Sequence, residues 1–390
     1  MSGGTIDHPR IALVTRRYPP LIGGAERVLS YLAPALAAEG AEVVVVTAQV
    51  PGLPAEAYPP SSVPVVRLPT ARTRFVGTWL YMRNLARWFA RNPIDLAYVS
   101  MLKHDAYVAI GVGRRLGFPV VLRPEGAGAT GDLAWQSWGR FGRTIGRRCR
   151  QADAVVAISP AIRAELLAAG YDPARIHDLP NGVPVPEEPW QPRAGWREAP
   201  QAIFVGRLAP EKGLDTLVAA WTQVRAEHPR ARLALLGEGP MRPVLEEQIA
   251  RLGLADAIVL AGPAADVTDR LRAADLFVLP SREEGMSIAL LEAMALGLPA
   301  VATAIPGNLG LMTNGVHGRL TPPDDPEGLA RAILAQWADP DAARAMAAVA
   351  RGRVMREFSI AAVARRHLDL FQRLIRAKNR SRWGAKRRPD

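Results

Sequence analysis

The 390-residue sequence has one cysteine and no long apolar run. Cys149 has no second cysteine with which to form an internal disulfide, which suits a reducing compartment. No stretch approaches the roughly 18–20 apolar residues that a membrane-spanning helix requires. The first ten residues are polar and no apolar segment follows them, so we expect no secretory signal. These features place the protein in the cytoplasm or at the inner face of its membrane.

The sequence also has fewer acidic than basic residues, 37 against 49, and the net charge is +12. Residues 373–390 contain eight cations and one carboxylate, so this segment alone supplies +7. The rest of the chain is only mildly basic and contains no nucleic-acid-binding motif, so we expect no nucleic-acid partner. We predict that the tail, residues 378–390, is disordered. An alternative is attraction to anionic lipid, at roughly 1 kcal/mol per basic residue near the surface.

Apolar segments typical of buried parallel strands alternate with helix-like segments along the chain. This alternation predicts an α/β protein with parallel sheets. A stretch rich in proline and glycine interrupts the pattern and separates two series of strands. The strands of the first series are residues 11–15, 43–47, 96–99, 120–123 and 154–158, and those of the second are residues 202–205, 232–236, 257–260, 276–279 and 300–303.

The interruption sets the domain boundaries that we expect. Residues 1–185 form the N-terminal domain, 186–200 the linker and 201–357 the C-terminal domain. A long helix over 358–377 follows the last strand, and the basic tail comes after it. Because ligands bind beyond the carboxyl ends of strands in open parallel sheets, each domain offers one such edge.

The first candidate site segment follows the strand 202–205 and carries two cations, Arg207 and Lys212. Both come shortly after the end of this strand, so both can reach one diphosphate. An arginine offers a planar fork to phosphate oxygens, whereas a lysine acts as a mobile point charge. The alternative is a surface loop without a ligand, in which Glu211 and Lys212 form an ordinary Glu-Lys pair.

A second candidate segment follows the strand 276–279 and opens a helix near Met286. Glu284 precedes this helix, and Glu292 lies about two turns inside it, roughly 80° away around the helix axis. Carboxylates accept hydrogen bonds from sugar hydroxyls. The helix start can bind a phosphate through backbone N–H groups. That start comprises Gly285, Met286, Ser287 and Ile288.

Two Gly-x-Gly patterns lack the third glycine of a dinucleotide-binding fingerprint. They begin at Gly237 and Gly111, and the third positions hold Arg242 and Leu116. We therefore interpret both as tight turns, which weakens the alternative of an NAD-dependent dehydrogenase. Gly237 remains a candidate for the donor side, because it directly follows a strand of the C-terminal domain.

Taken together, these segments resemble glycosyltransferase family 4, a group of retaining nucleotide-sugar transferases with the GT-B fold. The resemblance extends from residue 11 to about 325. Its motifs are Gly206-Arg207 with Glu211-Lys212-Gly213, Glu284 seven residues before Glu292, Gly23-Gly24-Ala25-Glu26-Arg27, Pro180-Asn181-Gly182-Val183, and residues 314–320.

The resemblance implies two facing Rossmann-like domains with a cleft between them, and a terminal helix that returns toward the N-terminal domain. It also implies that Arg207 and Lys212 bind the donor diphosphate, that Glu284 approaches the hydroxyls of the donor sugar and that Glu292 holds the ribose. Gly23 and Gly24 would lie near the phosphate and the acceptor, which the N-terminal domain would bind.

The chain departs from the family at one position. Many members have a histidine after a strand of the N-terminal domain, beside the transferred sugar, and here the matching position holds Glu125. Either Glu125 takes over this contact, or the acceptor side is built differently. Further candidates for that side are Gly126, Gly128, Asp132, His104 and Asn181.

The implied reaction transfers a hexosyl-type group from a nucleoside-diphosphate sugar to an acceptor hydroxyl with retention. It follows a front-side route without a protein nucleophile. No cluster of metal ligands suggests a metal, and no other cofactor is expected. The acceptor would be a glycan or a lipid-linked molecule. The alternatives are a non-hydrolysing sugar-nucleotide epimerase and a non-catalytic sugar-nucleotide-binding subunit.

A possible membrane contact is the segment 81–91, which mixes aromatic and basic residues at helical spacing. Tyr81, Leu85, Trp88 and Phe89 would be its apolar side. The two interpretations are an ordinary helix with a core face, and an interfacial helix that brings the N-terminal domain to a lipid-linked acceptor.

Overall fold

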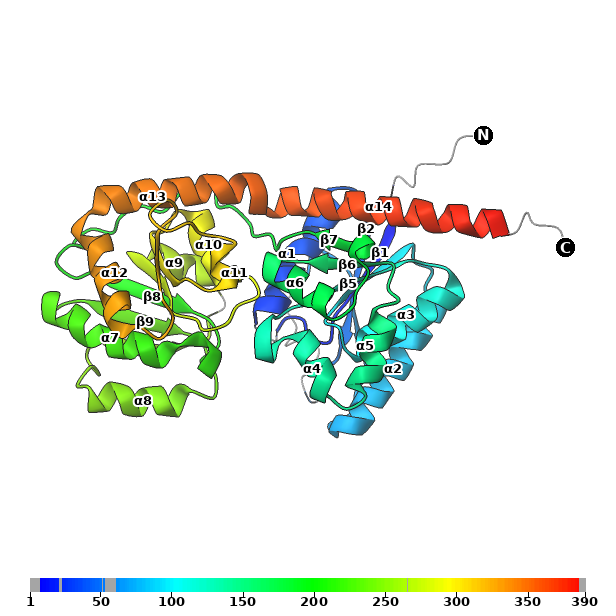
Figure 1. The fold of residues 1–390 in the computed structure, drawn as a ribbon, viewed down its shortest axis with the longest axis horizontal. Helices are drawn as coiled ribbons and strands as arrows, with labels where there is room; N and C mark the ends of the chain where they lie inside the picture. The colour runs from blue at the N-terminus through cyan, green and yellow to red at the C-terminus, as the bar shows by residue number, and fades with distance from the viewer. Residues whose placement is uncertain (1–7, 21–22, 51, 53–60, 265, 386–390) are drawn as a thin grey trace. The chain divides into compact units, whose positions relative to one another are not determined.

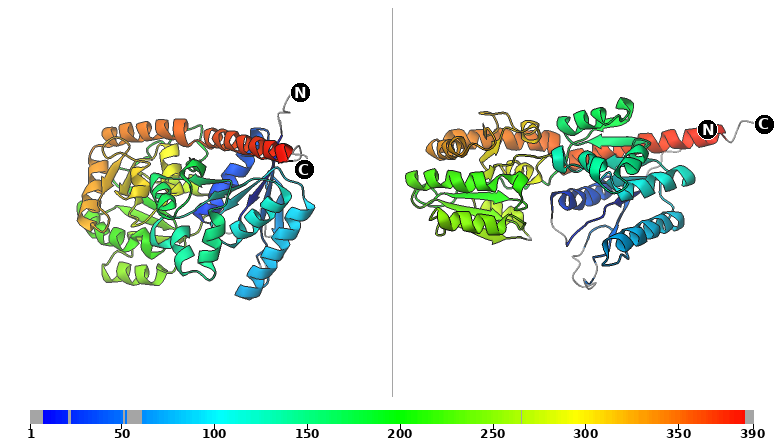
Figure 2. Two further views of the ribbon diagram at one scale, coloured as in Figure 1. Left: turned by 45° about the vertical axis from the view of Figure 1, so that its right-hand side comes forward. Right: turned by 60° about the horizontal axis from the view of Figure 1, so that its bottom comes forward.

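The computed structural model describes residues 8–20, 23–50, 52, 61–264 and 266–385. The chain divides into two compact units. Unit 1 comprises Met1–Gly182 and Ile360–Asp390, and unit 2 comprises Val183–Ser359. Each unit has a parallel sheet with helices packed on it (Figures 1 and 2), so the predicted α/β class with two parallel sheets is confirmed.

The sheet of unit 1 has seven strands in the order β3-β2-β1-β4-β5-β6-β7. All neighbouring strands are parallel. The central strands β1, β4, β5 and β6 are almost entirely buried, which explains their continuous apolar sequences. The strands are β1 Arg10–Val14, β2 Glu42–Ala48, β3 Val65–Leu68, β4 Leu96–Ser100, β5 Val120–Arg123, β6 Ala154–Ala157 and β7 Ile176–Asp178.

The helices of unit 1 pack in two groups, one formed by α1 with α14 and one by α2, α3 and α5. Gly111 and Gly113 lie inside α3, so our interpretation of them as a tight turn was wrong. The reason is packing, because a Cβ on Gly113 would lie 2.8 Å from the Val120 side chain of β5. The helices are α1 Gly24–Ala38, α2 Arg74–Arg91, α3 His104–Leu116, η2 Gly128–Thr130, α4 Asp132–Trp138, α5 Gly142–Cys149, α6 Pro160–Ala168, η3 Pro173–Arg175 and α14 Ile360–Ala385.

The tail that we expected to be disordered from residue 378 instead begins as helix, because α14 continues to Ala385. The Lys378 ammonium donates a hydrogen bond of 2.7 Å to the Asp153 carboxylate, which holds this part of α14 against unit 1. The sequence composition of the tail does not reveal that Lys378 pairs with Asp153. Residues 386–390 lie outside the described part of the chain.

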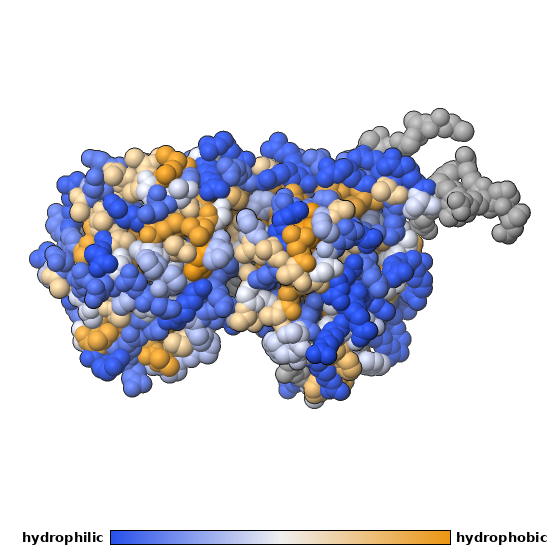
Figure 3. Space-filling model, in the orientation of Figure 1, coloured by the Kyte–Doolittle hydropathy of each residue, from blue (hydrophilic) through white to orange (hydrophobic). Residues whose placement is uncertain are grey.

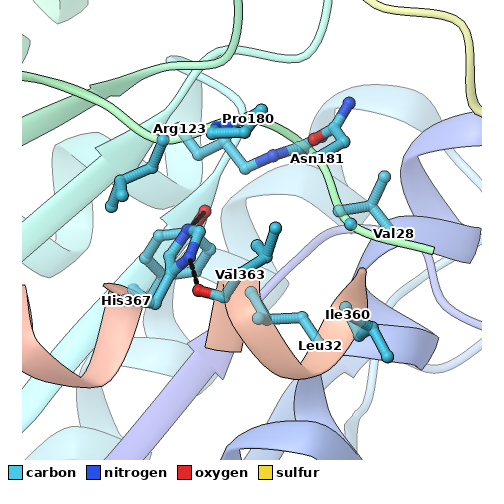
Figure 4. A pocket seen from close by; sticks show the side chains of 11 residues that line it. Val28, Leu32, Arg123, Pro180, Asn181, Ile360, Val363 and His367 are labelled. Carbon is cyan, nitrogen blue, oxygen red and sulfur yellow. Dashed lines mark hydrogen bonds between the residues drawn. The ribbon is translucent and has the colours of Figure 1, made fainter. Parts of the chain in front are cut away.

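A small cavity lies where α14 packs on α1, beside Tyr98 in the middle of β4 and Arg123 at the end of β5 (Figure 4). His367 of α14 is buried beside it and donates a hydrogen bond from Nδ1 to the Val363 carbonyl oxygen at 2.9 Å. Its Nε2 can then accept a hydrogen bond from the Tyr98 hydroxyl at 3.3 Å. Burial lowers the pKa of His367 to about 4, so the ring is held neutral.

The sheet of unit 2 has six parallel strands in the order β10-β9-β8-β11-β12-β13. Strands β8, β11 and β12 are buried apart from the first residue of β8, as expected for the middle of a sheet. The strands are β8 Gln201–Val205, β9 Arg232–Leu236, β10 Ile258–Gly262, β11 Leu276–Leu279, β12 Ala300–Thr303 and β13 Arg319–Thr321.

The helices of unit 2 also pack in two groups, α7 with α8 and α12, and α10 with α9 and α13. Helix α10 begins at Ile288 rather than near Met286, because the Ser287 hydroxyl caps it by accepting a hydrogen bond from the Leu290 N–H. The helices are η4 Pro210–Lys212, α7 Leu214–Glu227, α8 Arg242–Arg251, α9 Val267–Arg272, α10 Ile288–Leu296, α11 Pro306–Leu309, α12 Pro326–Ala338, α13 Pro340–Arg353 and a π-helix, η5, Val354–Phe358.

Each sheet has one position where the direction of the strand order reverses, between β1 and β4 in unit 1 and between β8 and β11 in unit 2. In open parallel sheets, the loops that follow the strands at this position form the ligand site. The topology therefore predicts that ligand sites are formed by the residues that follow these four strands.

Cys149 is fully buried, and burial raises the pKa of its thiol to about 12, so a reactive thiolate is disfavoured there. Among the residues that the structure describes, no helix has a stretch that is long and apolar enough to span a bilayer.

Candidate donor and acceptor sites

The loops after β8 and β11 meet through a buried ion pair. The Lys212 ammonium, at the end of η4, lies 2.6 Å from Oε1 of Glu284, and both side chains are mostly buried. The Ser281 hydroxyl donates a hydrogen bond of 2.9 Å to the same carboxylate oxygen. Glu284 therefore has a fixed position directly beyond the end of β11. The structure brings together two candidates that the sequence placed in separate segments.

Arg207 follows β8 and pairs with the Glu211 carboxylate of η4. Its side chain is exposed, unlike that of Lys212, so its guanidinium is accessible to a ligand. The backbone supports this arrangement, because the Glu211 carbonyl oxygen accepts a hydrogen bond of 2.8 Å from the Arg282 N–H. Arg207 and Lys212 thus belong to a loop that is attached to the Glu284 loop.

Arg282 fastens the same two loops through its side chain, a role that we did not assign from the sequence. Its guanidinium donates to the Pro210 carbonyl oxygen at 2.7 Å and to the carboxylates of Asp215 at 2.8 Å and Asp324 at 2.7 Å. These bonds connect three loops at the carboxyl edge of the sheet. An arginine two positions before Glu284 was the available signal, but its partners are 42 to 72 positions away in sequence.

Two glycines allow the loops of this edge to approach one another closely. Gly213 has a φ of +60°, and a Cβ there would lie 2.2 Å from the Pro280 carbonyl oxygen. Gly237 has a φ of +144°, and a Cβ there would lie 1.9 Å from the Gly206 carbonyl oxygen. Neither position accommodates a side chain without backbone movement. Gly237 therefore helps to shape the loop that holds Arg207.

The start of α10 lies beside Glu284. Gly285, Met286, Ser287 and Ile288 are all buried, and Ser287 already uses its hydroxyl to cap the helix. The capped N–H belongs to Leu290, in the first turn of α10, so this cap uses none of the backbone N–H groups of residues 285–288. Glu292 lies in the middle of α10 and is half-buried beside Leu291 and Ala293.

In unit 1, Glu125 lies two residues beyond the end of β5 and its side chain is almost fully buried. Ser100, the last residue of β4, donates a hydrogen bond to the Glu125 carboxylate. The buried Arg123 guanidinium lies 3.6 Å from the same carboxylate and donates a hydrogen bond of 2.7 Å to Asn181 Oδ1. Asn181 therefore positions Arg123 in this structure.

Burial is the main reason why the pKa of Glu125 rises to about 7. The Arg123 guanidinium lowers the pKa and the Asp132 carboxylate raises it; the Ser100 hydroxyl lowers it and the Glu26 carboxylate raises it. Near neutral pH, Glu125 is therefore able both to donate and to accept a proton.

Asp132 begins α4 and accepts a hydrogen bond of 2.8 Å from the Glu125 N–H. The Lys103 ammonium lies 3.6 Å from its carboxylate and 5.5 Å from the centre of the Trp135 ring. His104 packs edge-on against the same ring, with its pKa lowered mainly by burial and also by Arg16 and Lys103. Asp132 and His104 are thus linked to one another through Lys103 and Trp135.

The glycines of unit 1 have different roles. Gly23 precedes α1, and the Glu26 carboxylate folds back over it, only 2.3 Å from where a Cβ would be. Gly24 is exposed with open space around it. Gly126 lies in the turn before α4, where its carbonyl oxygen approaches Gly131 so closely that a Cβ built on Gly131 would lie 2.7 Å from it. Nothing in the contacts of these glycines points to a particular ligand.

The sequence did not reveal the residues that hold Glu125, namely Ser100 and Arg123, nor the pairing of Lys103 with Asp132. The available signal was Arg123 itself, because a charged residue at the end of a buried strand requires a partner. Across the described residues, no group of three or more His, Cys, Asp or Glu side chains is arranged to hold a metal ion.

Comparison with known proteins identifies the family and the class of fold. A family model for "Glycosyltransferase Family 4" matches residues 22–186, and one for "Glycosyl transferases group 1" matches residues 199–339. The two models together cover most of the chain. The chain belongs to glycosyltransferase family 4 and is a glycosyltransferase of the GT-B type.

Individual relatives agree with this assignment. The chain is 29% identical over 383 residues to the glycogen synthase of Mycobacterium tuberculosis, and the match covers 91% of this chain and 92% of that protein. An exopolysaccharide phosphotransferase of Streptomyces coelicolor is 31% identical over 252 residues, but this chain spans only 26% of its length.

Solved structures show the same fold. Sucrose-phosphate synthase from Thermosynechococcus elongatus superimposes with a TM-score of 0.79 at 24% identity, over 95% of this chain and 100% of that one. The Anabaena protein HepE in complex with UDP-glucose superimposes with a TM-score of 0.78 at 21% identity, over 93% and 99% of the two chains.

Proposed function

We propose that this glycosyltransferase transfers a hexosyl group from a nucleoside-diphosphate sugar to an acceptor hydroxyl, with retention of the anomeric configuration. The observation that carries the proposal is the Lys212–Glu284 pair at the strand reversal of unit 2, beside the exposed Arg207. Two cations, Arg207 and Lys212, next to the fixed carboxylate of Glu284 suit a ligand that has a diphosphate at one end and sugar hydroxyls at the other. The structural neighbour bound to UDP-glucose supports this donor class.

The cations would stabilise the leaving diphosphate. In the transfer, the bond between the anomeric carbon and the diphosphate oxygen breaks, and a bond to the acceptor oxygen forms on the same face. The acceptor proton moves to a diphosphate oxygen. Arg207 and Lys212 face the negative charge that develops on the leaving group, and preorganised charges of this kind usually contribute most to the rate. We propose that they act without a metal ion.

The carboxylates would recognise the sugar and the ribose. Glu284 is held by Lys212 and Ser281, which leaves its second oxygen, Oε2, as the atom to accept hydrogen bonds from the donor sugar. Glu292, further along α10, is proposed to hold the ribose hydroxyls. Gly237, Gly285, Met286, Ser287 and Ile288 complete the donor side as backbone contacts.

On the acceptor side, Glu125 is proposed to take the place of the histidine that many family members carry. Its carboxyl group is poised near neutral pH to donate a hydrogen bond to a sugar oxygen or to accept one from a hydroxyl. Gly23, Gly24, His104, Gly126, Asp132 and Asn181 are the other proposed acceptor-side residues. We propose a glycan or a lipid-linked acceptor in polysaccharide or glycolipid assembly, with the reaction in the cytoplasm.

The donor class is tested by thermal shift with UDP-, GDP- and ADP-sugars, because a ligand that binds only the folded state raises its stability. We expect one nucleotide series to stabilise the protein. Turnover with a panel of hydroxyl acceptors, in the presence of a metal chelator, then yields a product whose anomeric configuration is read by NMR. An inverted product would contradict retention, and activity lost on chelation would contradict metal independence.

The same experiment separates the alternatives. A new sugar nucleotide formed without any acceptor would indicate an epimerase. Binding of a sugar nucleotide with no turnover on any acceptor would indicate a non-catalytic binding subunit. No stabilisation by any nucleotide sugar would overturn the proposed donor site.

A further inference from the structure

Five large apolar side chains are exposed at one tip of unit 1. Phe75, Val76 and Trp79 belong to the first turns of α2, whereas Trp138 ends α4 and Phe141 precedes α5. The exposed fractions of the four aromatic residues are 64% for Phe75, 58% for Trp79, 70% for Trp138 and 64% for Phe141. Single exposed apolar residues are common, but a group of this size on one small region indicates a binding surface. We call these five residues the aromatic tip.

Arginines connect the two parts of the aromatic tip. The Arg140 guanidinium lies 4.7 Å from the centre of the Phe75 ring and 5.2 Å from that of Phe141. Arg83 lies over the Trp79 ring at 5.3 Å. The tip is therefore one continuous surface built from two segments that are far apart in the chain. In Figure 1 the first turns of α2 and the start of α5 lie together at the lower end of unit 1, where Figure 3 shows apolar side chains beside strongly hydrophilic ones.

The charge around the tip has one sign. Helix α2 and residues 139–150 contain nine arginines and no acidic residue. The exposed arginines are Arg83, Arg87, Arg91, Arg140, Arg143 and Arg147.

The exposed side of α2 is itself divided along its length. Phe75 and Trp79 occupy its first turns, and the exposed Arg83, Arg87 and Arg91 follow at intervals of four residues, each about 40° further around the helix axis than the last. Tyr81, Leu85 and Phe89, which we had considered as the apolar side of an interfacial helix, instead form the buried face of α2. The exposed aromatics thus lie on the other side of the helix and nearer its start than the sequence suggested.

We propose that the aromatic tip docks unit 1 on the interface of an anionic lipid bilayer. The tryptophan side chains insert at the level of the headgroups, where an amphipathic ring is favoured, and the phenylalanine rings bury their apolar surface at the boundary of the acyl chains. Arg83 and Arg140, whose guanidinium groups lie against the rings of the tip, then contact lipid phosphates, each adding roughly 1 kcal/mol near a charged surface. The charges favour an anionic bilayer as the partner, because a basic rim around exposed aromatic residues complements anionic headgroups over an apolar layer.

The position of the tip gives the docking a consequence for the acceptor. Trp138 stacks edge-on with Trp135, one turn earlier on α4, and Trp135 contacts both Lys103 and His104. The tip thus adjoins the residues proposed for the acceptor side. A lipid-linked acceptor in the bilayer would be presented beside them. This consequence rests on the proposed function, whereas the membrane contact does not.

The experiment is co-sedimentation of the full chain with vesicles of phosphatidylcholine alone and with vesicles that also contain phosphatidylglycerol. We expect binding to the anionic vesicles, weakened by raised salt because surface charges are screened. The double variant Trp79→Ser with Trp138→Ser should bind at least about tenfold more weakly, since two inserted rings are lost. The double variant Val259→Ser with Val349→Ser removes two exposed apolar residues of unit 2 and should bind like the original protein.

A second pair of variants separates the tip from the basic end of α14. Arg83→Gln with Arg87→Gln removes two exposed charges beside the tip, and Arg376→Gln with Arg380→Gln removes two from α14. We expect the first pair to weaken binding more than the second. Thermal stability and nucleotide affinity should remain unchanged in all four variants, which shows that they are folded.

Three results would overturn the proposal. They are absence of binding to anionic vesicles at low salt, undiminished binding by the Trp79→Ser, Trp138→Ser variant, and a loss confined to the α14 variant. Because vesicle binding needs no donor or acceptor, these results are distinguishable from a failure of the proposed enzymatic function.

Discussion

The Lys212 ammonium and the Glu284 carboxylate lie 2.6 Å apart, although 72 positions separate them in sequence. The pair joins the loop after β8 to the loop after β11, the two strands at which the order of the sheet reverses. It gives the lysine a fixed position and the carboxylate a fixed orientation before any ligand binds. A donor diphosphate would compete with Glu284 for the same ammonium group, so the two residues should respond differently to substitution.

Lys212→Ala should weaken the binding of the nucleoside diphosphate and reduce turnover by about 100-fold or more. The reason is that one charge facing the leaving group is lost, and removal of one such donor typically has an effect of this size. Isothermal titration and initial rates measure both effects. Arg225→Ala is the matched control, because it breaks a 2.7 Å ion pair with Asp256 in the same unit and should leave rate and affinity unchanged. Equal effects of the two substitutions would contradict the assignment of Lys212.

Glu284→Gln should reduce turnover without weakening the binding of the bare nucleoside diphosphate. The amide cannot hold Lys212 by charge, so the ammonium is freer to meet the diphosphate, while the contact to the donor sugar is impaired. Comparison of the affinities for the diphosphate and for the sugar nucleotide measures this difference. A variant that loses affinity for both ligands equally would show that Glu284 acts only as a structural partner of Lys212.

Gly237→Ala should lower the free energy of unfolding by more than about 3 kcal/mol. A Cβ at this position meets the Gly206 carbonyl oxygen at 1.9 Å, and the φ of +144° is itself unfavourable for alanine. Gly253→Ala is the control, because Gly253 has a φ of +66° and no atom within 4 Å of its Cβ position. This control should cost only about 1 kcal/mol. Urea unfolding measures both, and equal costs would refute the close approach of the two loops.

Glu125→Gln should change how stability depends on pH. The pKa of Glu125 is raised from 4.5 to about 7, so the folded protein binds this proton more tightly than the unfolded chain does. The free energy of unfolding of the original protein therefore falls as pH rises from about 4.5 to 7, by up to about 3 kcal/mol from this group. The variant lacks this contribution. Its stability relative to the original protein should increase over that range in urea unfolding, and a constant difference would contradict the raised pKa.

His367→Gln should have the opposite dependence on pH. The pKa of His367 is lowered from 6.5 to about 4, so the folded protein binds this proton more weakly than the unfolded chain does. The free energy of unfolding of the original protein therefore falls as pH decreases from about 6.5 to 4, by up to about 3 kcal/mol. The variant should lose less stability over this range. Unfolding curves at several pH values measure the slopes, and parallel slopes for the two proteins would rule out a neutral buried ring.

The sequence predicted the central strands well, because strands buried on both faces carry continuous apolar runs. Strands β9, β11 and β12 have the predicted bounds. It missed β3, β7 and β13, which are all edge strands with three or four residues and only partial burial. A short strand that pairs on one side has neither the length nor the apolar pattern to be recognised locally.

The candidate site divides in the same way. The sequence alone determined the class of fold, the family and the residue types beyond β8 and β11, since strand patterns and local motifs are properties of neighbouring residues. Only the tertiary structure decided that Lys212 pairs with Glu284, that Arg123 and Ser100 hold Glu125, and that Phe75 shares a surface with Phe141. These relationships depend on distance and burial between segments far apart in the chain. Burial also sets the protonation of Glu125, and no local pattern of residues contains that information.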